Sequence, residues 1–178
     1  YLDCDNDSTS TRNYYLVLHR GSVDINKSIY FSLSAYERIK TSSVNVSISG
    51  TASNKGNSSI SMSGVDSSVI SVNLTNDTKI PNKAIVTRIS SSGTQSPSQE
   101  NVHHMVMPAS NGNWYTSTVS SASSGHYNID IDDGIPVKQK WSFKYNALAT
   151  AKSTMRNVKL TIEFQYDLHD TDYETYIR

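Results

Sequence analysis

Acidic side chains recur in three short stretches of the sequence, at a spacing that could bind a cation. The stretches are "DCDND", "NIDIDDG" and "DLHDTDYE", and together they hold ten of the sixteen carboxylates. Calcium binds about six to eight oxygens, and D-x-D spacing can place successive carboxylates around one ion. The candidate ligands are Asp3, Asp5, Asp7, Asp130, Asp132, Asp133, Asp167, Asp170, Asp172 and Glu174. The alternative is that these stretches are one turn and two solvated termini.

A calcium ion would bind in one of two ways. The amino-terminal cluster is not an EF-hand, because neither the glycine nor the closing glutamate of that loop follows it. Clusters at opposite ends of the chain would repel one another at a subunit junction, and a divalent cation would turn this repulsion into attraction. The sequence therefore suggests calcium-bridged assembly, with an intrachain site at the "DDG" turn, residues 132–134, as the alternative.

An aromatic pair follows a turn in "NGNWYTSTV", a pattern that suits carbohydrate binding. A flat ring stacks on the apolar face of a sugar, while amide groups bind its hydroxyls. The candidate ligand-binding residues are Trp114, Tyr115, Asn111 and Asn113. The alternative is that Trp114 enters the core as a strand begins, which would point Tyr115 outward.

Signatures of catalysis are absent from the sequence. It contains no G-x-S-x-G, no glycine-rich phosphate loop and no H-E-x-x-H. His103 and His104 are adjacent, and on a strand they point to opposite faces, so they cannot ligate one metal from that element alone. We therefore expect a protein that is not an enzyme.

The elements that would position these residues are strands. In "NVKLTIEFQYDLHD", residues 157–170, the even positions from Val158 to Leu168 are apolar or aromatic and the odd positions up to Asp167 are polar, which predicts a strand with one buried face. The segment "NYYLVLHRG" is apolar on both faces from Tyr14 to Leu18, which predicts a central strand or a strand covered by a partner. Further alternation predicts strands over residues 29–35, 44–48, 70–74 and 141–145.

Clusters of Ser, Asn, Gly and Pro separate these segments, and residues 90–101 and 109–126 are the expected long loops. Residues 145–157 could form a short helix or a long connection. The pattern predicts an all-β fold, an antiparallel β-sandwich of jelly-roll or immunoglobulin-like type. We expect one domain over residues 1–178, with extended segments at about 1–14 and 168–178 that are free to bind a partner.

Composition limits the partners and the setting. Sixteen basic and sixteen acidic residues cancel, so we expect no nucleic-acid partner. No apolar run reaches the roughly 18 residues of a membrane span. Ser and Thr make up 46 of the 178 residues, and charged residues are few, which is typical of proteins outside the cell. The chain opens on "YLDCDNDSTS" as a processed terminus would, and its one cysteine, Cys4, allows no intrachain disulfide. We expect a secreted or cell-surface protein.

The alternating "NVKLTIEFQYDL" and the extended apolar "NYYLVLHR" near the amino end resemble exported fimbrial subunits and adhesins of the chaperone–usher type. The resemblance implies a sandwich completed by a strand from a neighbouring subunit. The chain departs from that pattern because a lone Cys4 cannot form the disulfide common in those subunits, and because ten residues follow Leu168.

The sequence thus predicts a structural subunit that polymerises with copies of itself into a filament, appendage or coat, by strand donation and calcium bridging. One alternative is a carbohydrate-binding module or adhesin, with a glycan as partner. Another is a viral or phage coat or fibre domain.

Overall fold

The computed structural model describes residues 39–121 and 125–168, together with residues 15, 17, 21, 22, 24, 26–28 and 30. The chain divides into two compact units, Tyr1–Ala35 and Tyr36–Arg178. All of the described strands belong to the second unit.

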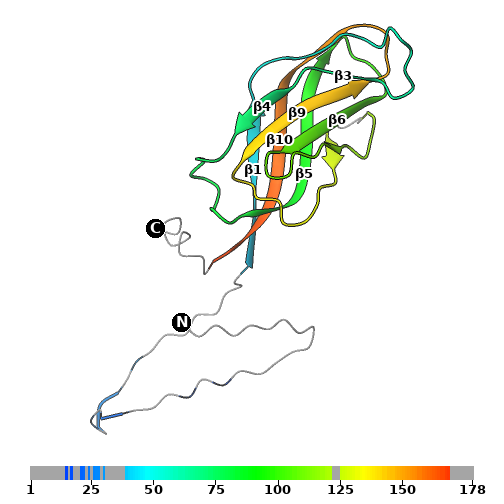
Figure 1. Ribbon diagram of the computed structural model, residues 1–178. Coiled ribbons are helices and arrows are strands. Elements are labelled where there is room, and N and C mark those ends of the chain that lie inside the picture. Colours follow the sequence, from blue (N-terminus) through cyan, green and yellow to red (C-terminus); the bar gives the residue numbers. More distant parts are fainter. Residues whose placement is uncertain are drawn as a thin grey trace. The chain divides into compact units, whose positions relative to one another are not determined.

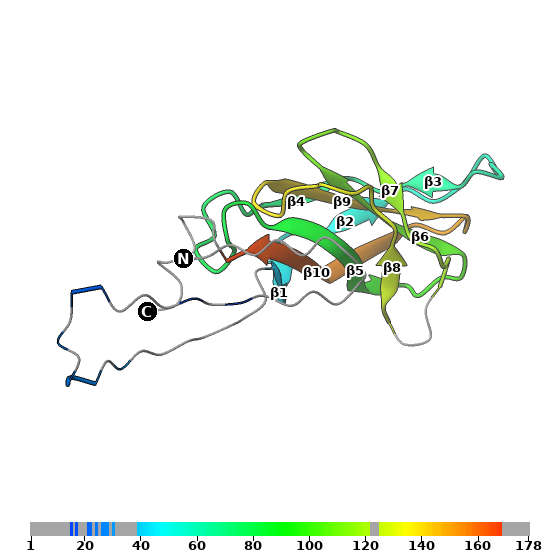
Figure 2. The same ribbon diagram turned by 90° about the horizontal axis from the view of Figure 1, so that it is seen from below.

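Ten strands occur in the described residues, and all of their pairings are antiparallel. Their bounds are β1 Ile39–Ile48, β2 Ala52–Asn54, β3 Val65–Asp66, β4 Ile70–Asn73, β5 Ile85–Ser96, β6 Val102–Pro108, β7 Tyr115–Thr116, β8 Tyr127–Ile129, β9 Lys140–Ala147 and β10 Ser153–Asp167. Sheet A has the order β1-β10-β5-β8, with β2 also paired to β10. Sheet B has the order β3-β9-β6-β7, with β4 also paired to β9. Figures 1 and 2 show the sheets as two layers, which confirms the predicted all-β sandwich.

The strand order is that of a jelly roll. Because β1 and β2 share one side of β10, and β3 and β4 share one side of β9, each pair counts as one interrupted edge strand. The first strand of the sandwich then lies beside the last one in the same sheet. An immunoglobulin sandwich places its first and last strands in different sheets, whereas a double Greek-key jelly roll brings them together. Of the two predicted types, the structure has the jelly roll.

The core lies between the sheets and follows the predicted alternation. On β10 the side chains of Leu160, Ile162 and Phe164 are at most 2% exposed, while Glu163 between them is exposed. Each such side chain contributes about 1.5–3 kcal/mol by leaving water. The facing strand β9 buries its predicted residues too, and these are Trp141, Phe143 and Tyr145.

The predicted loop over residues 90–101 is wrong for residues 90–96, because β5 continues to Ser96 and pairs with β10, and only residues 97–101 form a connection. Glycine is depleted in strands, and clusters of serine, glycine and proline are typical of loops, but packing requires serine and glycine here. Ser91 is buried and bonded to His104. A Cβ on Gly93 would lie 2.9 Å from the sulfur of Met155.

The segment 145–157, in which the sequence allowed a short helix, holds the end of β9, a connection and the start of β10. The other predicted loop, residues 109–126, contains the two-residue strand β7. No described residue is helical, so this part of the chain offers no helix with the length and hydrophobicity that a bilayer crossing needs.

In the first unit, the described residues include a turn in which the Asp24 carbonyl accepts a hydrogen bond from the Lys27 backbone N–H at 3.1 Å. Tyr15 and Val17 are more than 80% exposed and lie in no strand, so the prediction of a central strand is wrong for these two residues, whereas a strand covered by a partner stays a prediction. Nearly all of the predicted strand at residues 29–35 lies outside the described residues, as do the terminal segments 1–14 and 169–178.

Candidate functional site

Trp114 and Tyr115 lie on opposite faces of sheet B, at the start of β7. Tyr115 is paired with the buried Val106 of β6 and packs against the core, half-buried. Trp114 precedes it and therefore projects from the outer face, where it meets Lys144. The alternative weighed for this pair, with Trp114 inside and Tyr115 outside, is wrong, because the register of β7 on β6 places Tyr115 on the core side.

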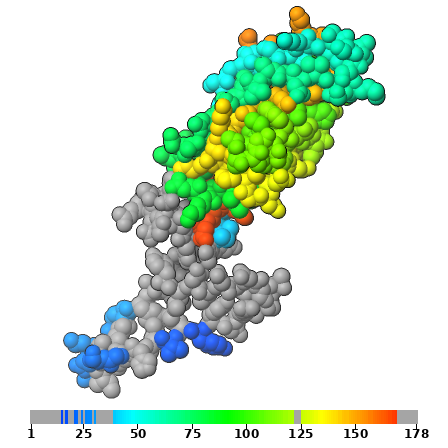
Figure 3. Space-filling view, in the orientation of Figure 1, coloured from blue at the N-terminus to red at the C-terminus, as the bar shows by residue number. Residues whose placement is uncertain are grey.

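The hydroxyl group of Tyr115 links two of the predicted sites. It donates a hydrogen bond to Asp132 Oδ2 at 2.6 Å and accepts one from Asn111 Nδ2 at 2.7 Å. Asn111 Oδ1 in turn accepts a hydrogen bond from the backbone N–H of Asn113 at 3.0 Å. Figure 3 shows the yellow-green segment around β7 lying against the yellow segment that carries Asp132. A predicted sugar-binding group and one of the predicted calcium ligands thus form one exposed network.

The bond to Asp132 is the first cause of a raised pKa for the Tyr115 hydroxyl, because a deprotonated phenol could no longer donate to the carboxylate. The hydroxyl therefore stays protonated at neutral pH and acts as a donor. A donor, an amide and a carboxylate that are all near solvent can exchange their mutual hydrogen bonds for bonds to a polar ligand.

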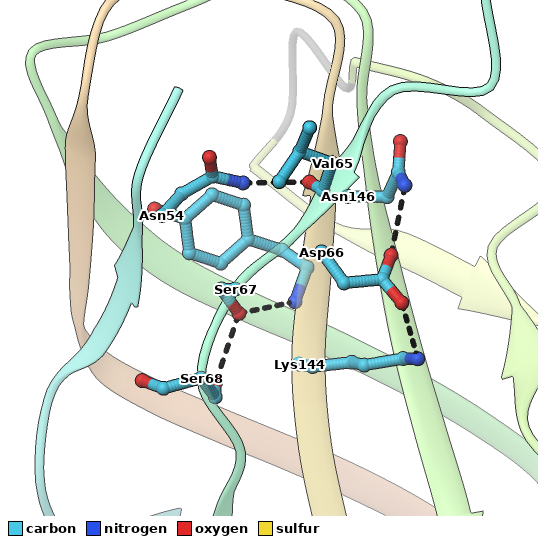
Figure 4. Close-up of polar contacts among 8 residues, drawn as sticks. Asn54, Val65, Asp66, Ser67, Ser68, Lys144 and Asn146 are labelled. Carbon is cyan, nitrogen blue, oxygen red and sulfur yellow. Dashed lines mark hydrogen bonds and ion pairs between the residues drawn. The ribbon is translucent and has the colours of Figure 1, made fainter. Parts of the chain in front are cut away.

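The outer face beside Trp114 carries a second polar cluster, which the sequence did not predict. The Lys144 ammonium lies 4.4 Å from the centre of the Trp114 ring and forms an ion pair with Asp66. Asn146 Nδ2 donates to the other carboxylate oxygen of Asp66 at 2.8 Å. Figure 4 shows Asp66 between Lys144 and Asn146, all on the β3–β9 side of sheet B.

Side-chain hydrogen bonds hold the short strand β3 that carries Asp66 (Figure 4). The hydroxyl of Ser67 accepts from the backbone N–H of Tyr145 at 3.0 Å and donates to the carbonyl of Ser68 at 2.9 Å. Asn54 Nδ2, from sheet A, donates to the carbonyl of Val65 at 2.7 Å. These contacts supply the order that a two-residue ladder alone would not give.

The pKa of the Asp66 carboxyl is lowered overall. Partial burial raises it, but the hydrogen bonds from Lys144 and Asn146 and the charge of Lys144 outweigh that effect. The Asp66 side chain is 43% exposed, so the ion pair contributes no more than about 1 kcal/mol to stability. A cation over a half-buried ring at the surface, such as Trp114, contributes about as little. The cluster thus orients Lys144 and Trp114 more than it stabilises the fold.

The two histidines behave as their adjacency predicted and lie on opposite faces of β6. His103 is half-buried, with Nδ1 at 3.3 Å from the carbonyl oxygen of Ser117. His104 is 1% exposed, lies 2.9 Å from Ser91 Oγ, and stacks on Tyr127 at 3.7 Å between ring centres. Burial lowers the pKa of His104 to about 3, so its ring is neutral. The Ser91–His104 pair is closed to solvent and belongs to the core.

The acidic stretches are only partly described. In the middle stretch, Asp130, Asp132 and Asp133 are exposed, and Asp132 bonds to Tyr115. Asp167 is half-buried and pairs with Ile39 at the end of β10. Within the described residues, no three His, Cys, Asp or Glu side chains are close enough to hold a metal ion together. The other predicted ligands lie outside the described residues, and they are Asp3, Asp5, Asp7, Asp170, Asp172 and Glu174.

Strand β1 is the second candidate site, because it leaves a long backbone edge open. All ten of its residues pair with β10 on one side. On its other side no strand among residues 39–121 and 125–168 pairs with it (Figure 1). Alternation in the sequence predicted part of this strand, but nothing in the sequence indicated that it would lie at the edge of the sheet.

Comparison with known proteins gives one close sequence relative. The chain is 48% identical over 168 residues to the uncharacterized protein YbdN of Bacillus subtilis (strain 168). The alignment covers 94% of this chain but 58% of YbdN, so the chain spans less than two thirds of that relative. No family model matches the sequence.

Among solved structures, this chain is similar to a protein chain in the cryo-EM structure of Mud crab tombus-like virus. That likeness has 11% sequence identity and a TM-score of 0.33, and it covers 95% of this chain and 100% of the other. A score of this size supports no conclusion about function.

Proposed function

We propose that the chain is a non-catalytic structural protein that associates with copies of itself through the free edge of β1. The observation that carries this proposal is the ten-residue edge, paired with β10 along its full length and unpaired on its other side within the described residues. We propose that the protein works outside the cell, in a filament, appendage or coat. Its low proportion of charged residues and its high Ser and Thr content support this location.

An open sheet edge exposes a row of backbone donors and acceptors, and proteins usually shorten or disrupt such edges to prevent unwanted pairing. The other edge strands described here are two to four residues long, namely β2, β3, β4, β7 and β8. In contrast, β1 has ten residues, no proline and Lys40 as its only charged residue. Such an edge is suited to pairing with an added strand.

The side chains of β1 favour a second copy as the added strand. Pairing across a two-fold axis must place outward-facing residues opposite outward-facing residues, because a shift of one residue would exchange the faces. The outward-facing positions alternate along β1. Ile39, at its start, is apolar and 49% exposed, and the four positions that follow are Thr41, Ser43, Asn45 and Ser47. All four are uncharged and hydrogen-bonding, so no like charges would meet. A net charge of zero removes long-range repulsion between copies.

A charge-exchange experiment tests this edge in the full chain. Lysines at Thr41 and Asn45 should repel their counterparts across the two-fold axis and weaken the dimer about tenfold. Glutamates at the same positions should do the same, and mixing the two variants should restore a dimer that contains one copy of each. The matched control carries serine at both positions, which removes the same side chains without adding charge. Sedimentation equilibrium would give the mass of each protein and of the mixture.

Two results would count against self-association. The first is a monomeric parent protein at every concentration. The second is a lysine variant with a lower melting temperature but an unchanged mass, because that would mean that the edge is covered by another part of the same chain. Two-fold pairing closes at a dimer, so negative-stain images of the parent protein would then show whether a further contact extends dimers into polymers.

Glycan binding is the second candidate function, and the exposed Asn111–Tyr115–Asp132 network favours it, with Trp114 next to Tyr115 in the sequence. Trp141 is fully buried, so in a chain with two tryptophans a ligand-induced change in fluorescence would report Trp114. Leu148 is an exposed residue outside this network and serves as the control position. If the hydroxyl network binds sugar, neutral oligosaccharides should change the emission of the parent protein and of the Leu148→Ala control, but not of a Tyr115→Phe variant. No change in any of the three would reject this function.

A further inference from the structure

A hollow of about 640 Å³ lies where the edge strand of sheet A is interrupted. It is lined by residues 47–50, at the end of β1, and by residues 156–159 of β10. Volumes of about 300–1,000 Å³ are typical of small-molecule sites. The hollow is separate from the aromatic pair and from the Asp66 cluster, which belong to sheet B.

Irregular pairing on both strands produces this hollow. Ile48 is the last residue of β1 to pair with β10, opposite Val158, and pairing resumes with Ala52 opposite Met155. Three residues on one strand thus face two on the other, and β10 also shifts its register against β5 between Arg156 and Lys159. Such bulges redirect side chains and occur often beside functional sites.

The backbone at the bulge adopts an uncommon conformation. Asn157 has a φ of 53°, in the left-handed region, and is paired in none of the three described ladders of β10. Gly50, across the hollow, has a φ of 108°, which only glycine adopts without strain. Residues in such conformations persist where the surrounding structure holds them, and they cluster at ligand sites.

The lining of the hollow is cationic. It includes the exposed Arg156 and Lys159, the hydroxyls of Ser47 and Ser49, and the Asn157 amide, and it includes no carboxylate. Across the strands, Lys159 is opposite Ser47 on one side and Ser92 on the other, so hydroxyls rather than acids are its neighbours. Two positive charges meet here in a chain with no net charge.

We infer that this hollow binds an anionic ligand through a tetrahedral oxyanion, a phosphate or a sulfate carried on a polar body such as a sugar. The planar guanidinium of Arg156 can bind two oxygens of such a group side by side, while Lys159 supplies a point charge. The serine hydroxyls donate to the remaining oxygens. The rest of the hollow is large enough for the body of the ligand, and its polar rim fits hydroxyl groups.

Titration of the full chain, followed by amide NMR, tests this site. Inorganic phosphate and sulfate should produce saturable shifts at the amides of residues 47–50 and 156–159, at a constant ionic strength set with sodium chloride. The double variant Arg156→Gln/Lys159→Gln should bind about tenfold or more weakly, because it loses two charge-assisted contacts. The control Lys79→Gln/Lys140→Gln removes two exposed charges elsewhere in the described part and should bind as the parent does. Melting temperatures would show that both variants fold.

The remaining arms identify the ligand. A hexose phosphate that binds more tightly than inorganic phosphate, with the neutral hexose inactive, would support the proposal of a sugar-borne oxyanion. Acetate that binds as tightly as phosphate would overturn the choice of a tetrahedral group. Shifts that do not saturate, or equal binding by the double variant and its control, would overturn the site itself. These variants leave the edge positions Thr41 and Asn45 intact, but the hollow shares Ser47 with the edge of β1. The mass of the Arg156→Gln/Lys159→Gln variant in sedimentation equilibrium therefore shows whether a loss of anion binding is separate from a loss of self-association.

Discussion

Replacing His104 would show how the core depends on pH. Its ring lies between the sheets, stacked within 9° of parallel on Tyr127 and at right angles to Phe143. Burial lowers its pKa to about 3 in the folded protein, whereas an exposed histidine in the unfolded chain has a pKa of about 6.5. Between these two values the unfolded chain binds a proton that the folded protein does not bind.

This difference fixes the sign and the size of the effect. The folded state has its full stability above pH 6.5, loses stability as the pH falls below that value, and loses no more from this residue below about pH 3. Each pH unit in the window costs about 1.4 kcal/mol. At pH 4.5 the protein should therefore be about 3 kcal/mol less stable than at pH 7.5 because of His104 alone.

Urea unfolding at pH 7.5 and pH 4.5 would measure this loss in the parent protein and in a His104→Phe variant. Phenylalanine keeps a ring against Tyr127 but cannot take up a proton. It also leaves the Ser91 hydroxyl without its partner, at a cost of about 1–3 kcal/mol that is the same at both pH values. A His103→Gln variant, changed on the outer face of the same strand, is the control and should lose stability as the parent does.

The loss of unfolding free energy between pH 7.5 and pH 4.5 should be larger in the parent protein than in the His104→Phe variant. If the parent and the His104→Phe variant lose the same free energy of unfolding between pH 7.5 and pH 4.5, His104 does not enter the folded core as a neutral ring. Asp66 does not contribute to the difference between pH 7.5 and pH 4.5. The stabilisation that its lowered pKa provides is present above about pH 3.8 and is lost only as the pH falls further.

Three further changes test the fold and the calcium hypothesis. Phe164→Ala should lower the free energy of unfolding in urea by about 3–5 kcal/mol, since the side chain is 2% exposed. Gln165→Ala, at the next residue, which is half-buried, should cost far less. Similar losses would contradict a strand that buries only one face. Gly56→Ala should lower the free energy of unfolding by about 2–3 kcal/mol, because φ at residue 56 is +82° and the new Cβ would lie 2.2 Å from the carbonyl oxygen of Thr150. Gly112 also has a positive φ but has open space around it, so Gly112→Ala should cost only about 1–2 kcal/mol. Equal losses in the two variants would contradict the close approach at Gly56. Calcium should increase the particle size of the parent protein in light scattering, and a chelator should reverse the increase. A variant with asparagine at three acidic positions should keep its size when calcium is added. An unchanged size and melting temperature in both proteins would reject the calcium hypothesis. These positions are Asp3, Asp5 and Asp7.

Some of the fold could be predicted from the sequence because apolar and polar residues alternate along individual strands. The alternation over Val158 to Phe164 and over Trp141 to Tyr145 appears in the structure as buried faces of β10 and β9. Opposite faces for His103 and His104 follow from the same two-residue period. These are properties of a strand as such, and they do not depend on what lies next to it.

Contacts between distant residues could not be predicted in this way. Asp66 and Lys144 are 78 residues apart, and strand order and register bring them together. Tyr115 and Asp132 are 17 residues apart, and the path of the connection that follows β8 brings Asp132 to β7. The open side of β1 likewise depends on the order of strands in sheet A.

The serine-rich end of β5 shows why local signals can also mislead. Residues 90–96 have the composition of a loop, yet they form a strand because Ser91 meets a buried histidine from the other sheet and Gly93 leaves room for Met155. Strand propensity mainly reflects how well a side chain packs against its neighbours. Those neighbours come from other parts of the chain, so only the tertiary structure could decide that this segment is a strand.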